Sequence, residues 1–163
     1  MGVRRVGVFI GAIAAALLVG STPAEAADQS PQVMTVVARD AILGINDNGA
    51  PGPTPGDIRT LSLTLFRKGK SVGHADIVQT LTRQNGDVGT AVKVIVLKLP
   101  RGTITAIGQT KFTNLVDPNA RPINLLEDIA VVGGTGAFLG ASGQVRITVL
   151  PKFASRWVIS LAR

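Results

Sequence analysis

Apolar and polar residues alternate along much of this chain, which is typical of β-strands that bury one face. The alternation is strict over Leu61–Leu65 and Gln144–Val149. Outside residues 1–26, no stretch keeps the apolar period of a helix. The pattern predicts an all-β domain of about eight strands, over residues 33–45, 61–65, 72–82, 91–99, 102–112, 129–132, 142–150 and 156–161.

The segments between these strands carry turn-forming residues. Asn85-Gly86 predicts a tight hairpin, because both residue types accept the positive φ that such turns need. Residues 91–99 are apolar on both faces apart from Lys93 and Lys98, which predicts a well-covered strand. The longest irregular stretch, Thr113–Leu125, is predicted to lie at a rim of the fold, where it would gate a binding site.

A glycine-rich stretch, Ala130–Leu150, lies between two apolar runs. Its Gly134, Gly136 and Gly140 are spaced G-x-G-x-x-x-G, whereas a dinucleotide-binding loop needs G-x-G-x-x-G at the start of a helix. A phosphate-binding loop is also excluded, because no Lys followed by Ser or Thr comes after the glycines. The stretch therefore predicts a strand, a glycine-rich turn with a bulge, and a second strand.

The same glycine-rich stretch carries a family resemblance. VVGGTGAFLGASG resembles the signature of plant dirigent proteins, and GGTGAFLGASGQV is similar to the glycine-rich segment of allene oxide cyclases. Upstream, GDIRTLSLTLF, GKSVGHADIVQTLT and LPRGTITAIGQTKF resemble successive strands of the same barrel. The resemblance implies a single antiparallel, calycin-like β-barrel around an apolar cavity.

Physical reasoning favours the same fold. An antiparallel sheet of about eight strands avoids exposed edges by closing into a barrel. A barrel of that size either holds one small ligand or is filled by its own side chains. The chain is rich in small and β-branched residues and poor in aromatic ones, which is compatible with both outcomes.

The N-terminal residues are typical of a secretory signal peptide. Two arginines precede an apolar run, Val6–Gly20, and a small-x-small sequence, Ala24-Glu25-Ala26, comes after it. An apolar run of about fifteen residues is shorter than the roughly 20 that span a bilayer. We therefore predict a cleaved signal peptide over residues 1–26, a barrel domain over residues 27–163, and a secreted, extracellular protein with no membrane partner after cleavage.

Charge and composition argue against several classes of function. The formal net charge is +7, but the basic residues are scattered apart from Arg67-Lys68-Gly69-Lys70. With one Trp and no Tyr the chain lacks the aromatic platform of single-strand binders, so we predict no nucleic-acid partner. The absence of cysteine and the single histidine exclude a thiol nucleophile and a multi-histidine metal site. No metal and no other cofactor are predicted, and a homo-oligomer is compatible with the sequence.

Asp40 is the first candidate catalytic residue. It lies in a strand segment, Val36–Leu43, that is apolar apart from Asp40 and Arg39, and an inward carboxyl there would lose contact with water and could serve as an acid. RDAIL also resembles the HDIL segment of dirigent proteins, which implies a cavity Asp that acts as an acid toward a quinone methide. The alternative is that Asp40 points outward and pairs with a Lys or Arg.

Other candidate acids and bases lie further along the chain. His74 and Asp76 share one face of a predicted strand and could form an acid–base pair at the cavity mouth; the alternative is two exposed neighbours. Glu127 and Asp128 precede a strand, so at most one of them enters a cavity, and solvated charges at the rim are the alternative. We predict a cofactor-free cyclase or isomerase that gives stereocontrol over a small hydrophobic substrate. The alternatives are a non-catalytic, lipocalin-like binder and a structural protein whose barrel is filled.

Overall fold

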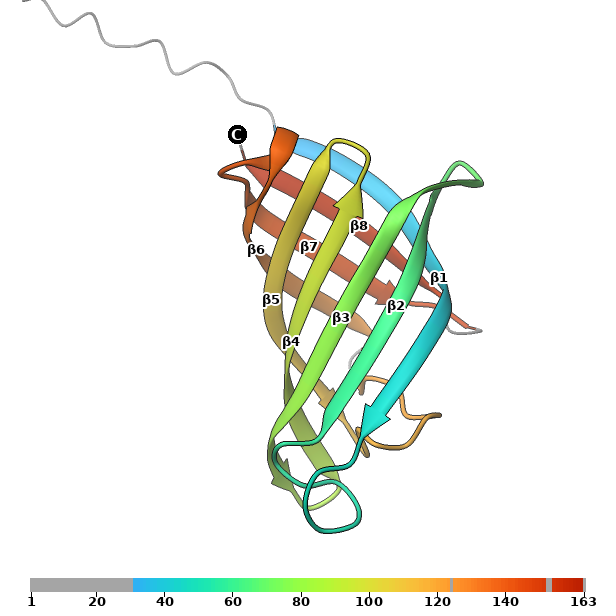
Figure 1. Cartoon of the computed structure of the whole chain (residues 1–163), viewed down its shortest axis with the longest axis vertical. Coiled ribbons are helices and arrows are strands. Elements are labelled where there is room, and N and C mark those ends of the chain that lie inside the picture. Colours follow the sequence, from blue (N-terminus) through green and yellow to red (C-terminus); the bar gives the residue numbers. More distant parts are fainter. Residues whose placement is uncertain (1–30, 124, 152–153, 163) are drawn as a thin grey trace, which may run out of the picture.

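The computed structural model describes residues 31–123, 125–151 and 154–162, so the predicted signal peptide lies outside the described residues. Within this part of the chain, eight strands form one closed antiparallel barrel (Figure 1). β1 pairs with β2 on one side and with β8 on the other, which closes the sheet. The predicted all-β barrel is confirmed. The elements are β1 (Gln32–Asn46), β2 (Ile58–Arg67), β3 (Lys70–Asn85), β4 (Val88–Leu99), β5 (Gly102–Phe112), β6 (Leu126–Gly134), the short 3-10 helix η1 (Gly136–Phe138), β7 (Ser142–Val149) and β8 (Ser155–Ala162).

The strand pairs follow the chain order, each joined to the next by a turn or loop. The predicted hairpin at Asn85-Gly86 joins β3 to β4, and Gly86 has the expected positive φ of 54°. Across the described residues, no helix is long and apolar enough to cross a membrane.

β4 shows how alternation places side chains in a barrel made of one sheet, where successive residues face the interior and the exterior in turn. Its inward residues Ala91, Ile95 and Leu97 are fully buried, and complete burial of an Ile or Leu side chain contributes about 1.5–3 kcal/mol. On its outer face Val96 is 37% exposed, because no second layer covers the sheet there. The expectation that this strand is well covered therefore holds for its inner face alone.

The barrel interior is divided into three levels. One end is filled by the larger apolar cluster, which includes Ile95, Ile104 and Trp157. At the other end, Leu115 and Ala120 of the loop that joins β5 to β6 pack with Leu81, Ala91 and Phe112 in a smaller cluster. Between them lies a set of buried polar residues, which we call the polar layer: Arg59, Gln79, Lys93, Thr110 and Glu127.

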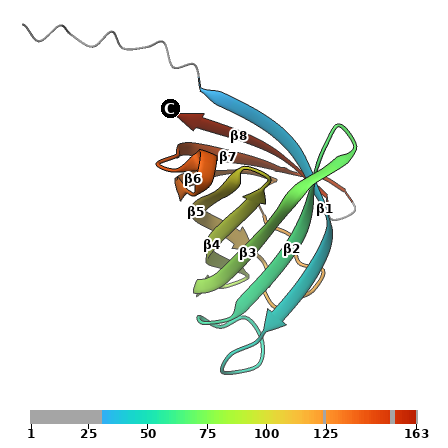
Figure 2. The ribbon, with the colours of Figure 1, turned by 45° about the horizontal axis from the view of Figure 1, so that its top comes forward.

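The turn of the glycine-rich stretch, between β6 and β7, lies at the end of the barrel where β8 finishes (Figure 2). Thr105 pairs with Gly133 and Ala106 with Val131, so Val132 is the extra residue of the predicted bulge. The turn after β6 contains η1, a feature that the sequence pattern does not predict.

Gly134 is required for close packing rather than for its φ, which is not positive. A Cβ atom on Gly134 would lie 2.5 Å from the Thr103 carbonyl oxygen and 2.6 Å from the Phe138 carbonyl oxygen, both backbone atoms that cannot move aside freely. A Cβ on the preceding Gly133 would meet nothing within 4 Å.

We expect Gly134→Ala to lower the free energy of unfolding by about 1–3 kcal/mol, as overpacking does. Gly133→Ala is the matched control and should change it by no more than about 0.5 kcal/mol. Urea denaturation followed by circular dichroism measures both. Equal effects of the two substitutions would contradict the packing of this turn.

Candidate functional site

A cavity of about 90 Å³ lies inside the barrel, beneath the β5–β6 loop. Loop residues Ala120, Arg121 and Pro122 line it on one side. Inward-facing strand residues and Ala154, between β7 and β8, form the rest of its wall. The predicted position of this loop at a rim is confirmed. Most of the lining is apolar, and the polar residues in it are Arg59, Gln79, Lys93, Arg121, Glu127 and Ser155.

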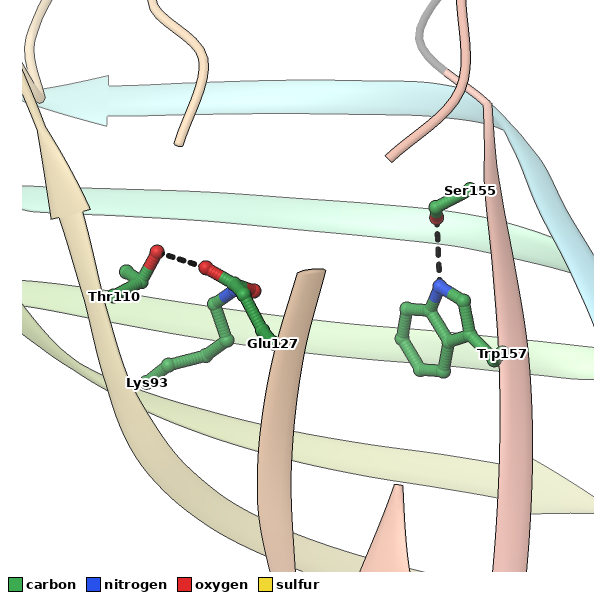
Figure 3. A network of polar contacts seen from close by, with 5 residues as sticks. All are labelled: Lys93, Thr110, Glu127, Ser155 and Trp157. Atoms are coloured by element: carbon green, nitrogen blue, oxygen red, sulfur yellow. Dashed lines mark hydrogen bonds and ion pairs between the residues drawn. The ribbon is translucent and has the colours of Figure 1, made fainter. Parts of the chain in front are cut away.

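A buried ion pair occupies the wall of this cavity (Figure 3). Lys93 on β4 donates a hydrogen bond from Nζ to Oε2 of Glu127 on β6, and Thr110 on β5 donates from Oγ1 to Oε1 of the same carboxylate. The side chains of Lys93 and Glu127 are 5% and 4% exposed. Each oxygen of the Glu127 carboxylate thus accepts a hydrogen bond. A charged pair tolerates burial only when hydrogen bonds of this kind replace those that water would make.

Burial lowers the pKa of the Lys93 ammonium, since the charged form loses contact with water. The Glu127 carboxylate opposes this effect through its charge and its hydrogen bond, whereas the positive charge of Arg59 adds to it. Lys93 therefore releases its proton more readily than an exposed lysine does.

Arg59 and Gln79 extend the polar layer on β2 and β3. The two residues are directly opposite each other in the strand register, and Gln79 is in turn opposite Lys93. Arg59 donates a hydrogen bond from Nη1 to the Ala120 carbonyl oxygen at 3.0 Å, and its guanidinium lies 5.4 Å from the centre of the Phe112 ring. Burial is the largest cause that lowers the pKa of Arg59.

Trp157 on β8 lines another part of the cavity wall, apart from the ion pair (Figure 3). It is the only tryptophan of the sequence, and its indole donates a hydrogen bond from Nε1 to Ser155 Oγ at 2.6 Å. Because its polar atom is already paired, the ring offers an apolar surface to the cavity.

Asp40 does not lie where the regular alternation of β1 predicts. Between Arg39 and Ile42 the register with β2 shifts by one residue, and Asp40 takes a positive φ of 59°. This bulge leaves the Asp40 side chain 63% exposed, 4.0 Å from the Arg39 Nε, and puts Ala41 into the cavity lining. The prediction that Asp40 points inward is therefore wrong, and the structure shows the alternative, an outward Asp40 beside an arginine.

His74 and Asp76 do lie together, with 3.5 Å between His74 Nε2 and Asp76 Oδ2. Asp76 also accepts a hydrogen bond from Ser62 Oγ at 2.8 Å. Both residues are on the outer face of β3, because the alternating neighbours Ala75 and Ile77 fill the interior. The structure therefore brings the pair together away from the cavity.

Glu127 and Asp128 diverge as successive strand residues must. Asp128 points outward and forms a bidentate pair with Arg146, whose hydrogen bond at 2.7 Å lowers the pKa of Asp128. Glu127 points inward, so the rim position that was the alternative for it is wrong. On a regular strand, Glu127 faces the same side as the apolar Ile129 and Val131, because the three residues are at alternate positions of β6. This spacing was the signal in the sequence that could identify Glu127 as buried.

Lys93 was visible in the sequence only as a polar break in an apolar strand. Since both faces of that strand carry valine, isoleucine or leucine, the pattern did not say which way Lys93 points. Among the residues that the structure describes, no three His, Cys, Asp or Glu side chains gather to hold a metal ion.

Comparison with known families decides the classification. The family model described as an allene oxide cyclase barrel-like domain matches residues 37–157. The chain belongs to the allene oxide cyclase barrel-like family. No curated protein sequence matches it significantly.

Solved structures share the barrel of this allene oxide cyclase-like protein. A pyocyanin demethylase superposes with a TM-score of 0.66 at 23% identity, covering 80% of this chain and 100% of the other. An exo-specific intermolecular Diels–Alderase gives 0.55 at 19% identity, covering 80% and 98%. A pterocarpan synthase dirigent protein gives 0.50 at 17% identity, covering 82% and 90%. At these identities the likeness concerns the fold.

The buried pair of this allene oxide cyclase-like barrel leads to a stability prediction. Lys93→Met leaves the Glu127 carboxyl buried without its cation and should cost about 3–5 kcal/mol of unfolding free energy. The double variant Lys93→Met/Glu127→Leu removes both charges and should be more stable than the single variant. Urea denaturation of the wild type, Lys93→Met, Glu127→Leu and the double variant measures the coupling free energy between the two side chains. Losses that simply add would show that the two side chains do not depend on each other.

The lowered pKa of Lys93 also predicts a pH dependence. Between the folded-state pKa and the ordinary value of 10.5, the unfolded chain binds more protons at Lys93 than the folded chain does. Stability conferred through Lys93 should therefore rise as the pH rises through this window. The measurement is the melting temperature of the wild type minus that of Lys93→Met/Glu127→Leu between pH 7 and 10.5. A difference that falls with pH would refute the direction of the shift.

Proposed function

We propose that this protein is a secreted, cofactor-free cyclase or isomerase that acts on a small hydrophobic substrate inside the barrel. The observation that carries the proposal is the Lys93–Glu127 pair in the wall of a cavity whose lining is mostly apolar. Buried titratable groups at a cavity are a common mark of acid–base sites, because fixed charges act strongly where water is excluded. Secretion rests on the N-terminal sequence pattern alone.

The chemistry that these residues support is the transfer of a proton within one substrate. The Glu127 carboxylate accepts a proton from a carbon next to a carbonyl group, and the Lys93 ammonium donates a hydrogen bond to the carbonyl oxygen as it gains negative charge. Glu127 then returns the proton to a different carbon, so the product has the same atoms as the substrate. Thr110 holds one carboxylate oxygen in place, which leaves the second lone pair of that oxygen for the substrate.

The apolar wall contributes orientation. Leu61, Ile77 and Trp157 line the cavity and restrict the poses that a flexible substrate can take. Fixing a reactive pose lowers the barrier to a ring closure even where no proton moves. Barrels of the same fold bear the names of a demethylase, a Diels–Alderase and a dirigent protein, which supports a small organic molecule as the substrate class.

The proposal assigns the proton transfer to Glu127 and Lys93 rather than to the residues favoured by sequence. Asp40, His74 and Asp76 are exposed on the outside of the barrel, and their catalytic roles stay predictions that no contact with the cavity supports.

A non-catalytic binder is the second candidate. The observation in its favour is that Glu127 already has a partner on each oxygen, as a purely structural pair would. A cavity of about 90 Å³ is also below the about 300–1,000 Å³ of most ligand pockets, so a substrate of ordinary size needs the loop at Ala120–Pro122 to move aside.

Glu127→Gln distinguishes the two candidates. If Glu127 transfers the proton, the substitution should lower turnover by about 10²–10⁴-fold while ligand binding persists. The measurement is conversion of conjugated ketones and polyenes to products of equal mass, followed by chromatography and mass spectrometry. Asp128→Asn removes a neighbouring carboxylate from the outer face and should leave turnover unchanged.

Two further variants complete the experiment. Glu127→Asp keeps the charge and guards against loss of folding, and it should retain part of the turnover. Asp40→Asn tests the residue favoured by sequence. Loss of turnover in Asp40→Asn together with full turnover in folded Glu127→Gln would refute the assignment.

A further inference from the structure

Arg59 is buried in the cavity wall with most of its donor groups unused by the protein. The residue is 3% exposed, and its guanidinium has five N–H donors. Within the described part of the chain its hydrogen bond is the one to the Ala120 carbonyl, and its Nε is buried with no partner. The Phe112 ring stabilises the cation in part. None of the ion pairs among the described residues joins Arg59 to a carboxylate.

The only carboxylate in the described cavity lining does not neutralise Arg59. That carboxylate belongs to Glu127, and Lys93 and Thr110 occupy its two oxygens. The Lys93–Glu127 pair is neutral as a unit. Asp117, outside the cavity lining, attracts the Arg59 cation, but Arg121 in the lining repels it more strongly. The cavity wall beside Arg59 therefore carries net positive charge. A buried cation of this kind favours an anionic group placed beside it.

Gln79 provides a second unused group next to Arg59. It is 3% exposed, it lies directly opposite Arg59 in the β2–β3 register, and its Oε1 is buried without a partner among the described residues. Opposite residues on neighbouring antiparallel strands have Cβ atoms about 4.5–5.5 Å apart. Two residues of the cavity lining, each with an unpartnered polar atom, thus lie side by side.

On the basis of the function proposed above, we infer that the ligand is a small aromatic or conjugated organic acid with a hydroxyl or N–H group beside its anionic oxygen. The anionic oxygen accepts hydrogen bonds from Arg59, and the neighbouring hydroxyl or N–H donates to Gln79 Oε1. The aromatic rings of Phe112 and Trp157 line the same cavity and suit a flat ligand. A cavity of about 90 Å³ admits no more than about one ring, and a larger ligand extends past the loop.

Three probes of nearly equal size separate these contributions. Salicylate has both the anionic oxygen and the hydroxyl, benzoate lacks the hydroxyl, and salicylamide lacks the charge. Trp157 reports binding directly, because it is the only tryptophan and it lines the cavity. We expect fluorescence titration to show salicylate binding at least about tenfold more tightly than salicylamide, since charge-assisted hydrogen bonds are the stronger kind. Salicylate should bind about three- to tenfold more tightly than benzoate.

Substitutions assign each difference to a residue. Arg59→Met should abolish the preference for salicylate over salicylamide, and Gln79→Leu should abolish only the preference over benzoate. Arg59→Lys keeps the charge and should retain a reduced preference, which guards against a variant that fails to fold. Arg67→Met, an exposed arginine on the same strand, is the control and should change neither preference.

The binding results separate failure of this inference from failure of the proposed function. Equal binding of the three probes, or an unchanged preference in folded Arg59→Met, overturns the inference and leaves the proposed function standing, because the cavity still accepts ligands. No fluorescence change with any probe overturns the inference and also removes the open cavity on which the proposed function rests.

Discussion

Closure of the sheet by the pairing of β1 with β8 is the constraint on which the rest of the structure depends. It gives every strand an inner face that no solvent layer reaches, and alternation then sends every second residue into one shared space. Apolar residues fill one end of that space and a smaller apolar cluster fills the other. Polar residues between them are costly to bury unless they find partners inside the barrel. Lys93, Thr110 and Glu127 do so, whereas Arg59 Nε and Gln79 Oε1 do not.

The Lys93–Glu127 pair follows from this constraint. The two residues are 34 positions apart in the chain. Pairing of β4 and β6 with the two edges of β5 places them at the same depth, and closure of the sheet keeps both side chains inside the barrel. Burial strengthens the attraction between the charges and raises the cost of breaking the pair. The same low-dielectric setting makes the pair useful to chemistry, because a proton moved there meets fixed charges rather than reorienting water. Structure and proposed function therefore depend on one arrangement.

Local patterns in the sequence could predict most of the fold but not the site. Alternation predicts the strands, and the spacing of Gly134, Gly136 and Gly140 excludes the nucleotide-binding loops that would suggest a different fold. Asp40 was misplaced because a single inserted residue in β1 reverses the facing of the residues after it, and alternation alone cannot reveal a bulge. Lys93 was missed because its strand is apolar on both faces. The ion pair itself is a long-range contact, so no local pattern carries it.

The most direct test of the central claim is a crystal structure of the complex with the tightest-binding compound from a library of small organic molecules. The claim is that the interior beside Lys93 and Glu127, beneath the β5–β6 loop, is the functional site. The predicted result is electron density for the compound inside the barrel, in contact with Arg59 and Trp157. Density confined to the outer face, beside His74 and Asp76, would contradict it and would favour the residues suggested by the sequence.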